Sequence, residues 1–221
     1  HVAIGVDAGR LNTTGASNTF IGRTAGESNT TASNNTALGY AALTANTTGN
    51  KNVAFGAEAL DANTVANDNT ALGYSSLSAN TTGGSNTACG KNALMSNTTA
   101  DVNTAVGTDA LKLNTTGTQN VAVGALSLDA NTTARYNTAI GYASLGSNTT
   151  GEENVAVGRQ CLRDNTTGQF NVGMGVNTLY SNNADHNTAL GTAALGANTT
   201  VTQNTAVGSL VLDANTPGNY N

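Results

Sequence analysis

Apolar and polar positions follow one another along the chain in a fixed order that returns every 17 residues. Each unit reads Asn, Thr or Val, Ala, an aliphatic residue, Gly, two variable residues, Ala or Ser, Leu, two further residues, Asn-Thr-Thr and three closing residues. The units begin at His1, Asn18, Asn35, Asn52, Asn69, Asn86, Asn103, Asn120, Asn137, Asn154, Asn171, Asn187 and Asn204. A fixed period of this kind is typical of a stacked solenoid, so we expect residues 1–221 to form a single continuous repeat domain.

One step of the period is irregular. The unit that begins at Asn171 has 16 residues, because the loop from Asn182 to His186 lacks one residue. The pattern resumes at Asn187 without any linker, so the shortened loop is expected to leave the stack intact.

The start of each unit predicts a short strand that ends at a glycine. In Asn120–Gly124, Val121 and Val123 share one face of the strand and Ala122 takes the other. No amphipathic stripe with a 3.6-residue period occurs, which speaks against a helical solenoid. We therefore expect an all-β fold, a parallel β-solenoid or β-roll of thirteen rungs. Each rung would hold two short strands, two turns and a thin core of Val, Leu and Ala.

The glycine after the strand occurs in every unit. A position held only by Gly indicates a positive φ, or a backbone packed too closely for a Cβ atom. We expect these residues to form a structural corner: Gly5, Gly22, Gly39, Gly56, Gly73, Gly90, Gly107, Gly124, Gly141, Gly158, Gly175, Gly191 and Gly208.

The asparagine in the second half of the unit is equally regular. Stacked identical Asn side chains can bond amide to amide along the stack, and Asn also suits left-handed turns. We expect a structural ladder of Asn12, Asn29, Asn46, Asn63, Asn80, Asn97, Asn114, Asn131, Asn148, Asn165, Asn182, Asn198 and Asn215. The Asn that opens each unit would form a second ladder, with one ladder at each turn.

The first two units differ from the rest. Leu holds its position from Leu43 through Leu212, whereas these two units have Gly9 and Gly26 instead. Terminal repeats are often atypical, so the two glycines indicate a different neighbour at the N-terminal end.

Composition excludes several classes of protein. The formal net charge is −5 and the pI is about 4.7, so the chain lacks the basic stripe of a nucleic-acid binder. No apolar run approaches the roughly 18–20 residues of a membrane span, so we expect no membrane insertion. Because Ala is so frequent, one coil buries little by itself, and association of chains, three side by side, would supply the missing burial.

The strand-and-corner segment resembles the head repeats of trimeric autotransporter adhesins, which form a haemagglutinin-like left-handed β-roll. Residues 2–5, 121–124 and 155–158 carry this likeness most closely, with Val-Ala followed by Ile or Val and then Gly. The longer form of the unit, as in residues 35–49, resembles repeats in tail-fibre-like proteins of phages and large viruses. The resemblance covers essentially the whole chain and implies a left-handed, homotrimeric attachment fibre. It implies no catalytic residues.

Residues that could support catalysis or metal binding are few. His1 and His186 are the only histidines, one terminal and one in the irregular loop. Asp61, Asp129 and Asp213 share one repeat position but are scattered among the units, and we interpret them as solvated surface carboxylates. We expect no enzyme activity, no metal ion and no cofactor.

The two cysteines lie four rungs apart. At about 4.8 Å per rung, Cys89 and Cys161 would be roughly 19 Å apart, too far for a disulfide, which needs Cα atoms within about 7 Å. We interpret both as small buried hydrophobic residues.

Asn-Thr-Thr is also a formal glycosylation acceptor, but neighbouring units would place acceptors about 4.8 Å apart, too close for a glycan on each. We therefore favour the structural ladder. Specificity would come from variable positions, where Tyr40, Tyr74, Tyr142 and Tyr180 are candidate surface contacts that could stack on sugars.

These observations predict a structural or adhesive fibre segment, the stalk or head of a trimeric surface adhesin or viral tail fibre. Its location would be extracellular, on a cell surface or on a virion. Its partners would be copies of itself and a cell-surface glycan or protein receptor. Two alternatives stay open: a self-assembling extracellular filament, and an ice-binding solenoid.

Overall fold

A computed structural model describes residues 1–213 of the chain, which divide into two compact units: unit 1 is His1–Thr116, and unit 2 begins at Gly117. Unit 1 contains β1 (Val2–Ile4), β2 (Thr19–Ile21), β3 (Thr36–Leu38), β4 (Val53–Phe55), β5 (Thr70–Leu72), β6 (Thr87–Cys89) and β7 (Thr104–Val106). Unit 2 contains β8 (Val121–Val123), β9 (Thr138–Ile140), β10 (Val155–Val157), β11 (Val172–Met174), β12 (Thr188–Leu190) and β13 (Thr205–Val207). No helix occurs within residues 1–213.

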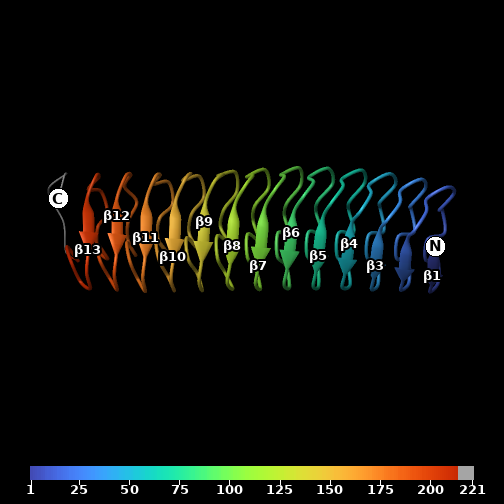
Figure 1. Ribbon diagram of the computed structural model, residues 1–221, viewed down its shortest axis with the longest axis horizontal. Helices are drawn as coiled ribbons and strands as arrows, with labels where there is room; N and C mark the ends of the chain where they lie inside the picture. The colour runs from blue at the N-terminus through green and yellow to red at the C-terminus, as the bar shows by residue number, and fades with distance from the viewer. Residues whose placement is uncertain (214–221) are drawn as a thin grey trace. The chain divides into compact units, whose positions relative to one another are not determined.

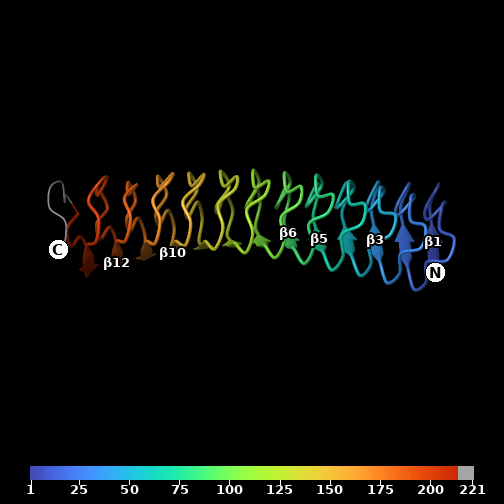
Figure 2. The same cartoon turned by 90° about the horizontal axis from the view of Figure 1, so that it is seen from above.

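In each unit every strand pairs in parallel with the next strand along the chain (Figure 1). The register places each repeat position on its equivalent in the next rung, as in Val2 beside Thr19. The 16-residue step keeps this register, with Val172 beside Thr188. Seen from above, the segments that return from one strand to the next are stacked as well (Figure 2). The predicted all-β parallel β-solenoid with rungs of about 17 residues is confirmed.

The second predicted strand of the rung is absent throughout the described residues. The return segment instead holds two residues in the left-handed region, the second residue after the corner glycine and the Leu, as at Ala41 (φ 56°) and Leu43 (φ 55°). Its backbone alternates between local and inter-rung hydrogen bonds. The N–H of Leu43 donates to the carbonyl of Ala59 in the next rung, and that of Asn46 to the carbonyl of Leu43. A strand cannot form because left-handed residues interrupt its extended backbone.

The core is thinner than the sequence predicted, because it lacks the strand valines. From β2 to β13 the middle residue of each strand is buried, as at Ala37 and Ala54, and the Leu residues from Leu43 to Leu195 are fully buried with them. Val2 and Val53 are instead 47% and 40% exposed. The predicted Val/Leu/Ala core is thus wrong for the strand valines, since the narrow interior accepts only a small side chain from the sheet.

Phe20 is the large exception inside unit 1. It stands where other strands have Ala, and it is fully buried. A Cβ added at Gly26 would lie 2.5 Å from its ring, and one at Gly9 would lie 2.9 Å from it. Gly9 and Gly26, which stand where later repeats have Leu, therefore accommodate one aromatic ring. The His1 ring meets the Phe20 ring edge-on, with centroids 5.5 Å apart.

The corner glycines have φ values between 130° and 142°. They also pack closely between rungs. A Cβ added at Gly73, for example, would lie 2.6 Å from the carbonyl oxygen of Gly90 in the next rung. Both predicted reasons for glycine therefore apply. The positive φ disfavours any other residue, and the close packing leaves no room for a Cβ atom.

The ladder of Asn-Thr-Thr asparagines is present within each unit. The amide of Asn97, which is fully buried, donates to Oδ1 of Asn80 (2.8 Å) and to the carbonyl of Ala100 (3.1 Å). Its own Oδ1 accepts a hydrogen bond from Nδ2 of Asn114 (3.0 Å). Asn97 thus closes its own turn and bonds to both neighbouring rungs. Asn215 lies outside the described residues.

The asparagines that open the 17-residue repeats form a second ladder of a different kind. The side-chain Oδ1 of Asn35 accepts from the backbone N–H of Asn52 (2.8 Å), while its Nδ2 donates to the carbonyl of Gly49 (2.8 Å). That carbonyl also accepts from Nδ2 of Asn46 (3.0 Å). The two ladders therefore meet at one carbonyl per rung, and the expectation of one ladder at each turn is wrong.

The shortened loop is repaired by a side chain. In regular rungs the backbone N–H groups of the Asn-Thr-Thr turn donate to a threonine carbonyl of the next rung, as Thr13 does to Thr30 (2.9 Å). At the short step, Oδ1 of Asn183 accepts these bonds from Thr166 (3.0 Å) and Thr167 (2.9 Å). The side-chain amide oxygen thus stands in for the carbonyl of the missing residue. At the same step, the Oδ1 of Asn165 is buried without a hydrogen-bond partner.

The difference in hydrogen bonding between Asn97 and Asn165 provides a test of the ladder. Asn97→Ala removes three hydrogen bonds and leaves buried partners unsatisfied, so we expect it to lower the free energy of unfolding by about 3 kcal/mol or more. Asn165→Ala removes only the two bonds that its Nδ2 donates, to Asn148 and Gly168. In denaturant unfolding, the loss of unfolding free energy in Asn165→Ala should therefore be about 1 kcal/mol smaller than in Asn97→Ala. Equal losses in the two variants would contradict the ladder as a source of stability.

The last residue of each rung yields a second test. Val102 is exposed and has φ 59°, which is unfavourable for a β-branched residue, whereas Asn34 holds the same repeat position at φ 62°. Val102→Asn should raise the free energy of unfolding by about 0.5–1 kcal/mol. The matched control is Val65→Asn, because Val65 is similarly exposed but has no positive φ. A gain at both positions would show that polarity, not backbone strain, causes the effect.

Candidate functional site

The outward face of the strands carries an exposed apolar row in each unit. The first and third residues of every strand point outward, and the third is apolar or Cys in all of them. In unit 1 this row includes Ile4 (58% exposed), Phe55 (49%) and Leu72 (43%), and in unit 2 it includes Met174 (46%) and Leu190 (46%). No outward strand position within residues 1–213 carries a charge. We define these positions as the sheet face.

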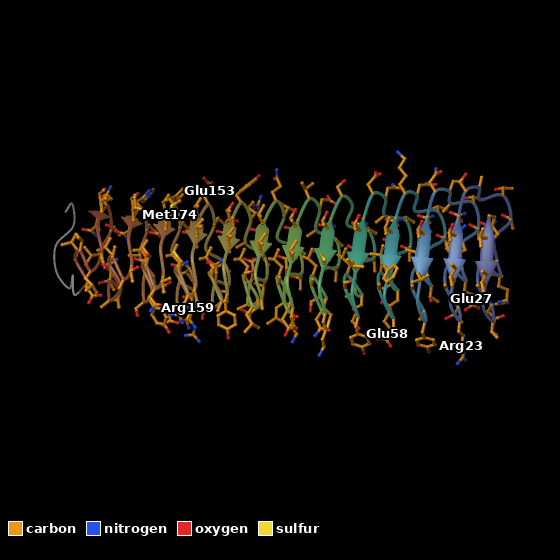
Figure 3. All side chains as sticks on the ribbon, turned by 60° about the horizontal axis from the view of Figure 1, so that its bottom comes forward. Arg23, Glu27, Glu58, Glu153, Arg159 and Met174 are labelled. Carbon is orange, nitrogen blue, oxygen red and sulfur yellow. The ribbon has the colours of Figure 1, made fainter. Side chains whose placement is uncertain are left out.

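Charged residues lie away from the sheet face. Figure 3 shows Arg159 and Glu153 of unit 2 projecting from opposite edges of the coil. Arg159 follows a corner glycine, and Glu153 closes an Asn-Thr-Thr turn. Parallel sheets in globular proteins are normally covered on both faces, and contiguous exposed apolar patches mark interaction sites. The sheet face is therefore the leading candidate for an interface.

The four candidate tyrosines are not gathered into one patch. Tyr40, Tyr74 and Tyr142 each follow a corner glycine and are 52%, 51% and 51% exposed. Tyr180 holds a different repeat position, after the Leu, and its hydroxyl accepts a hydrogen bond from Nη1 of Arg163 (3.1 Å). The guanidinium of Arg23 lies over the Tyr40 ring, 5.9 Å from its centroid. Tyr142 also lines a recess.

The two histidines occupy separate aromatic contacts. His1 meets the Phe20 ring, and His186 stacks on Phe170 with ring centroids 4.9 Å apart. Within residues 1–213 no group of three or more His, Cys, Asp or Glu side chains is close enough to hold a metal ion. The same residues include no helix that could span a membrane.

The cysteines differ in their surroundings. Both are free thiols. Cys161 is buried, as expected, and burial raises its pKa to about 12. Cys89 is half-buried in the apolar row of the sheet face, so the expectation of full burial is wrong for this residue.

Asp61 departs from the expected solvated carboxylate, since its Oδ1 is buried and has no hydrogen-bond partner. Burial raises its pKa, and the negative charge of Glu58 adds to the effect. Asp213, at the same repeat position, is exposed as predicted. This difference could not be predicted from the repeat position, because it depends on how neighbouring rungs cover each side chain.

The asparagines of the Asn-Thr-Thr turns are buried and hydrogen-bonded within the fold. From Asn29 to Asn198 their side chains are fully buried, and their amides bond to neighbouring rungs. The first threonine of the pair is also engaged, as Oγ1 of Thr30 donates to the carbonyl of Thr47 (3.0 Å). In the folded chain these amides are structural groups, inaccessible to a modifying enzyme.

Comparison of the chain with protein-family models, with curated protein sequences and with solved structures found no match. The resemblance to adhesin and tail-fibre repeats therefore stays a prediction.

The buried carboxylate of Asp61 yields a pH-dependent prediction. Because its pKa is raised in the folded chain, the neutral form favours folding, and that stability is lost as the pH rises through the folded-state pKa. Asp61→Asn should therefore raise the melting temperature at pH 7, and the gain should shrink toward pH 3, where the wild-type carboxyl is protonated. Asp213→Asn is the control, and an equal gain there would contradict the assignment to burial.

Proposed function

We propose that this chain is a segment of an attachment fibre whose copies associate through the sheet face. The observation that carries the proposal is the uncharged apolar row on the outer side of the parallel strands. Covering its half-exposed large side chains would contribute roughly 1 kcal/mol each, about half the value for full burial. A thin Ala/Leu interior gives each coil little burial of its own, so association would supply a second core.

The association we propose is a left-handed homotrimer, as the resemblance to adhesin head repeats implies. A closed cyclic arrangement would turn the sheet face of every chain toward a common axis and leave the edges outside. Charged and aromatic residues at those edges, such as Tyr74 and Arg159, would then face the surroundings. The fibre would stand on a cell surface or virion, or act outside a cell, and it would bind a glycan or protein receptor.

A mechanical role fits the hydrogen bonding better than an enzymatic one. Two asparagine ladders and the backbone bonds tie each rung to its neighbours within a unit, so the rungs resist bending and sliding. No group of side chains described above combines a nucleophile with a base. The proposed activity is to hold binding surfaces at a distance, without chemical turnover.

Ice binding is the second candidate, because the outward strand positions form regular rows. Thr or Val fills the first row, as at Thr36 and Val53, and larger side chains fill the second. The second row mixes Phe55, Cys89 and Met174 with smaller residues, so its height is uneven. A flat lattice match to ice would require uniform side chains. The uneven row therefore favours association with another chain.

The test is the mass in solution by light scattering, with electron micrographs of the same sample. We expect short rods with a mass near three times 22.0 kDa. Leu72→Asp, on the sheet face, should reduce the species to a monomer, because a buried carboxylate in the interface would be unpaired. Val65→Asp is the matched control, since Val65 is equally exposed but lies in an Asn-Thr-Thr turn.

Three outcomes would overturn the trimer. A stable wild-type monomer would remove the interface, and thermal hysteresis by that monomer would favour ice binding. Micrometre filaments would favour end-to-end self-assembly. Dissociation by both aspartate variants would show that charge, not the sheet face, controls association.

A further inference from the structure

A recess in unit 2 arises where one repeat position lacks a side chain. The first residue after the Leu is Asp129, Gly146 and Arg163 in three successive rungs. Gly146 leaves a gap between the carboxylate and the guanidinium, and the recess has a volume of about 180 Å³. Its wall is completed by Tyr142, Ser147 and Gln160, among others.

The gap is not required by the backbone. Gly146 has no positive φ, and Thr44 holds the same repeat position in unit 1. A Cβ added at Gly146 would lie 3.3 Å from Oδ1 of Asp129 and 3.3 Å from the carbonyl oxygen of Ala143. A side chain there would fill the recess and press against the carboxylate. Glycine is therefore not needed for folding at this position, although it is needed for the recess.

The lining combines an aromatic platform with polar groups of several kinds. The Tyr142 ring is half exposed, which leaves area for stacking. Arg163 is held in place, because its Nη1 donates to Oδ1 of Asp164 (2.9 Å) and to the Tyr180 hydroxyl (3.1 Å). Gln160 is likewise oriented, since its Oε1 accepts a hydrogen bond from Nη1 of Arg159 (3.1 Å). Held side chains lose less entropy on binding than free ones.

The geometry points to a carbohydrate site, and we propose that the recess binds a terminal neutral hexopyranose of a glycan. A carboxylate, a guanidinium, an amide and a hydroxyl together can donate to and accept from sugar hydroxyls. Because Arg163 is paired with Asp164, the Asp129 carboxylate leaves the recess without an excess of positive charge, which favours a neutral sugar over an acidic one. The recess is smaller than the roughly 300–1,000 Å³ of a site for a drug-sized ligand, so one sugar ring is the appropriate size.

The inference deepens the proposed attachment function by naming the receptor class. It does not depend on the trimer, because the recess lies on the return segments and the association on the sheet face. Sugar binding and oligomeric mass are measured separately, so either can fail while the other stands.

The experiment is binding of the full chain to immobilised glycans that end in neutral hexoses, with glycans that end in sialic or glucuronic acid alongside. We expect binding to the neutral set. Gly146→Thr should abolish it by filling the recess. Tyr142→Ala should weaken it roughly 3- to 10-fold, the value expected for the loss of one stacking contact.

Tyr74→Ala is the matched control. Tyr74 has the same exposure and repeat position as Tyr142, but Ser78 takes the place of the glycine in its rung. This variant should bind like the wild type, and circular dichroism should show all three variants folded. The proposal is overturned by absence of binding to neutral glycans, by binding to acidic glycans only, or by binding that survives Gly146→Thr.

Discussion

The hydrogen bonding of buried asparagine side chains is the constraint on which the rest of the structure depends. A coil this narrow buries few apolar atoms, so each buried polar atom left without a hydrogen bond costs a large share of its stability. A ladder asparagine with all of its bonds made, such as Asn97, donates twice and accepts once, and it fixes both the turn of its own rung and the spacing to the next. The one shorter rung persists because the amide oxygen of Asn183 replaces a backbone carbonyl.

The same narrowness determines what lies outside. The sheet contributes mainly Ala from its inner face, and the larger Phe20 fits where its neighbours are Gly9 and Gly26. The aliphatic residues of the strands are therefore excluded from the interior and form an exposed apolar row. The chain thus has a surface suited to association for the same reason that a single coil has a thin core.

Repetition also limits where specificity can reside. Ladder asparagines, corner glycines and core leucines are needed in every rung, so only the variable positions can distinguish one rung from another. The recess at Gly146 illustrates how this works, since one missing side chain between Asp129 and Arg163 changes a regular edge into a concave polar site. A regular scaffold holds such a site rigidly, because the rungs on either side fix its walls.

The sequence by itself determined the period, the parallel stacking, the members of the ladder and the glycine corners. These are readable because identical positions stack on one another, so a requirement at one rung repeats at every rung. Only the tertiary structure decided which strand face lies inside, that each rung has one strand, and that both ladders meet at one carbonyl. Alternation defines two faces without saying which is buried, and the hydrophobicity of Val53 favoured the wrong one. Left-handed residues such as Leu43 carry no local signal, because neighbouring rungs hold them in that conformation.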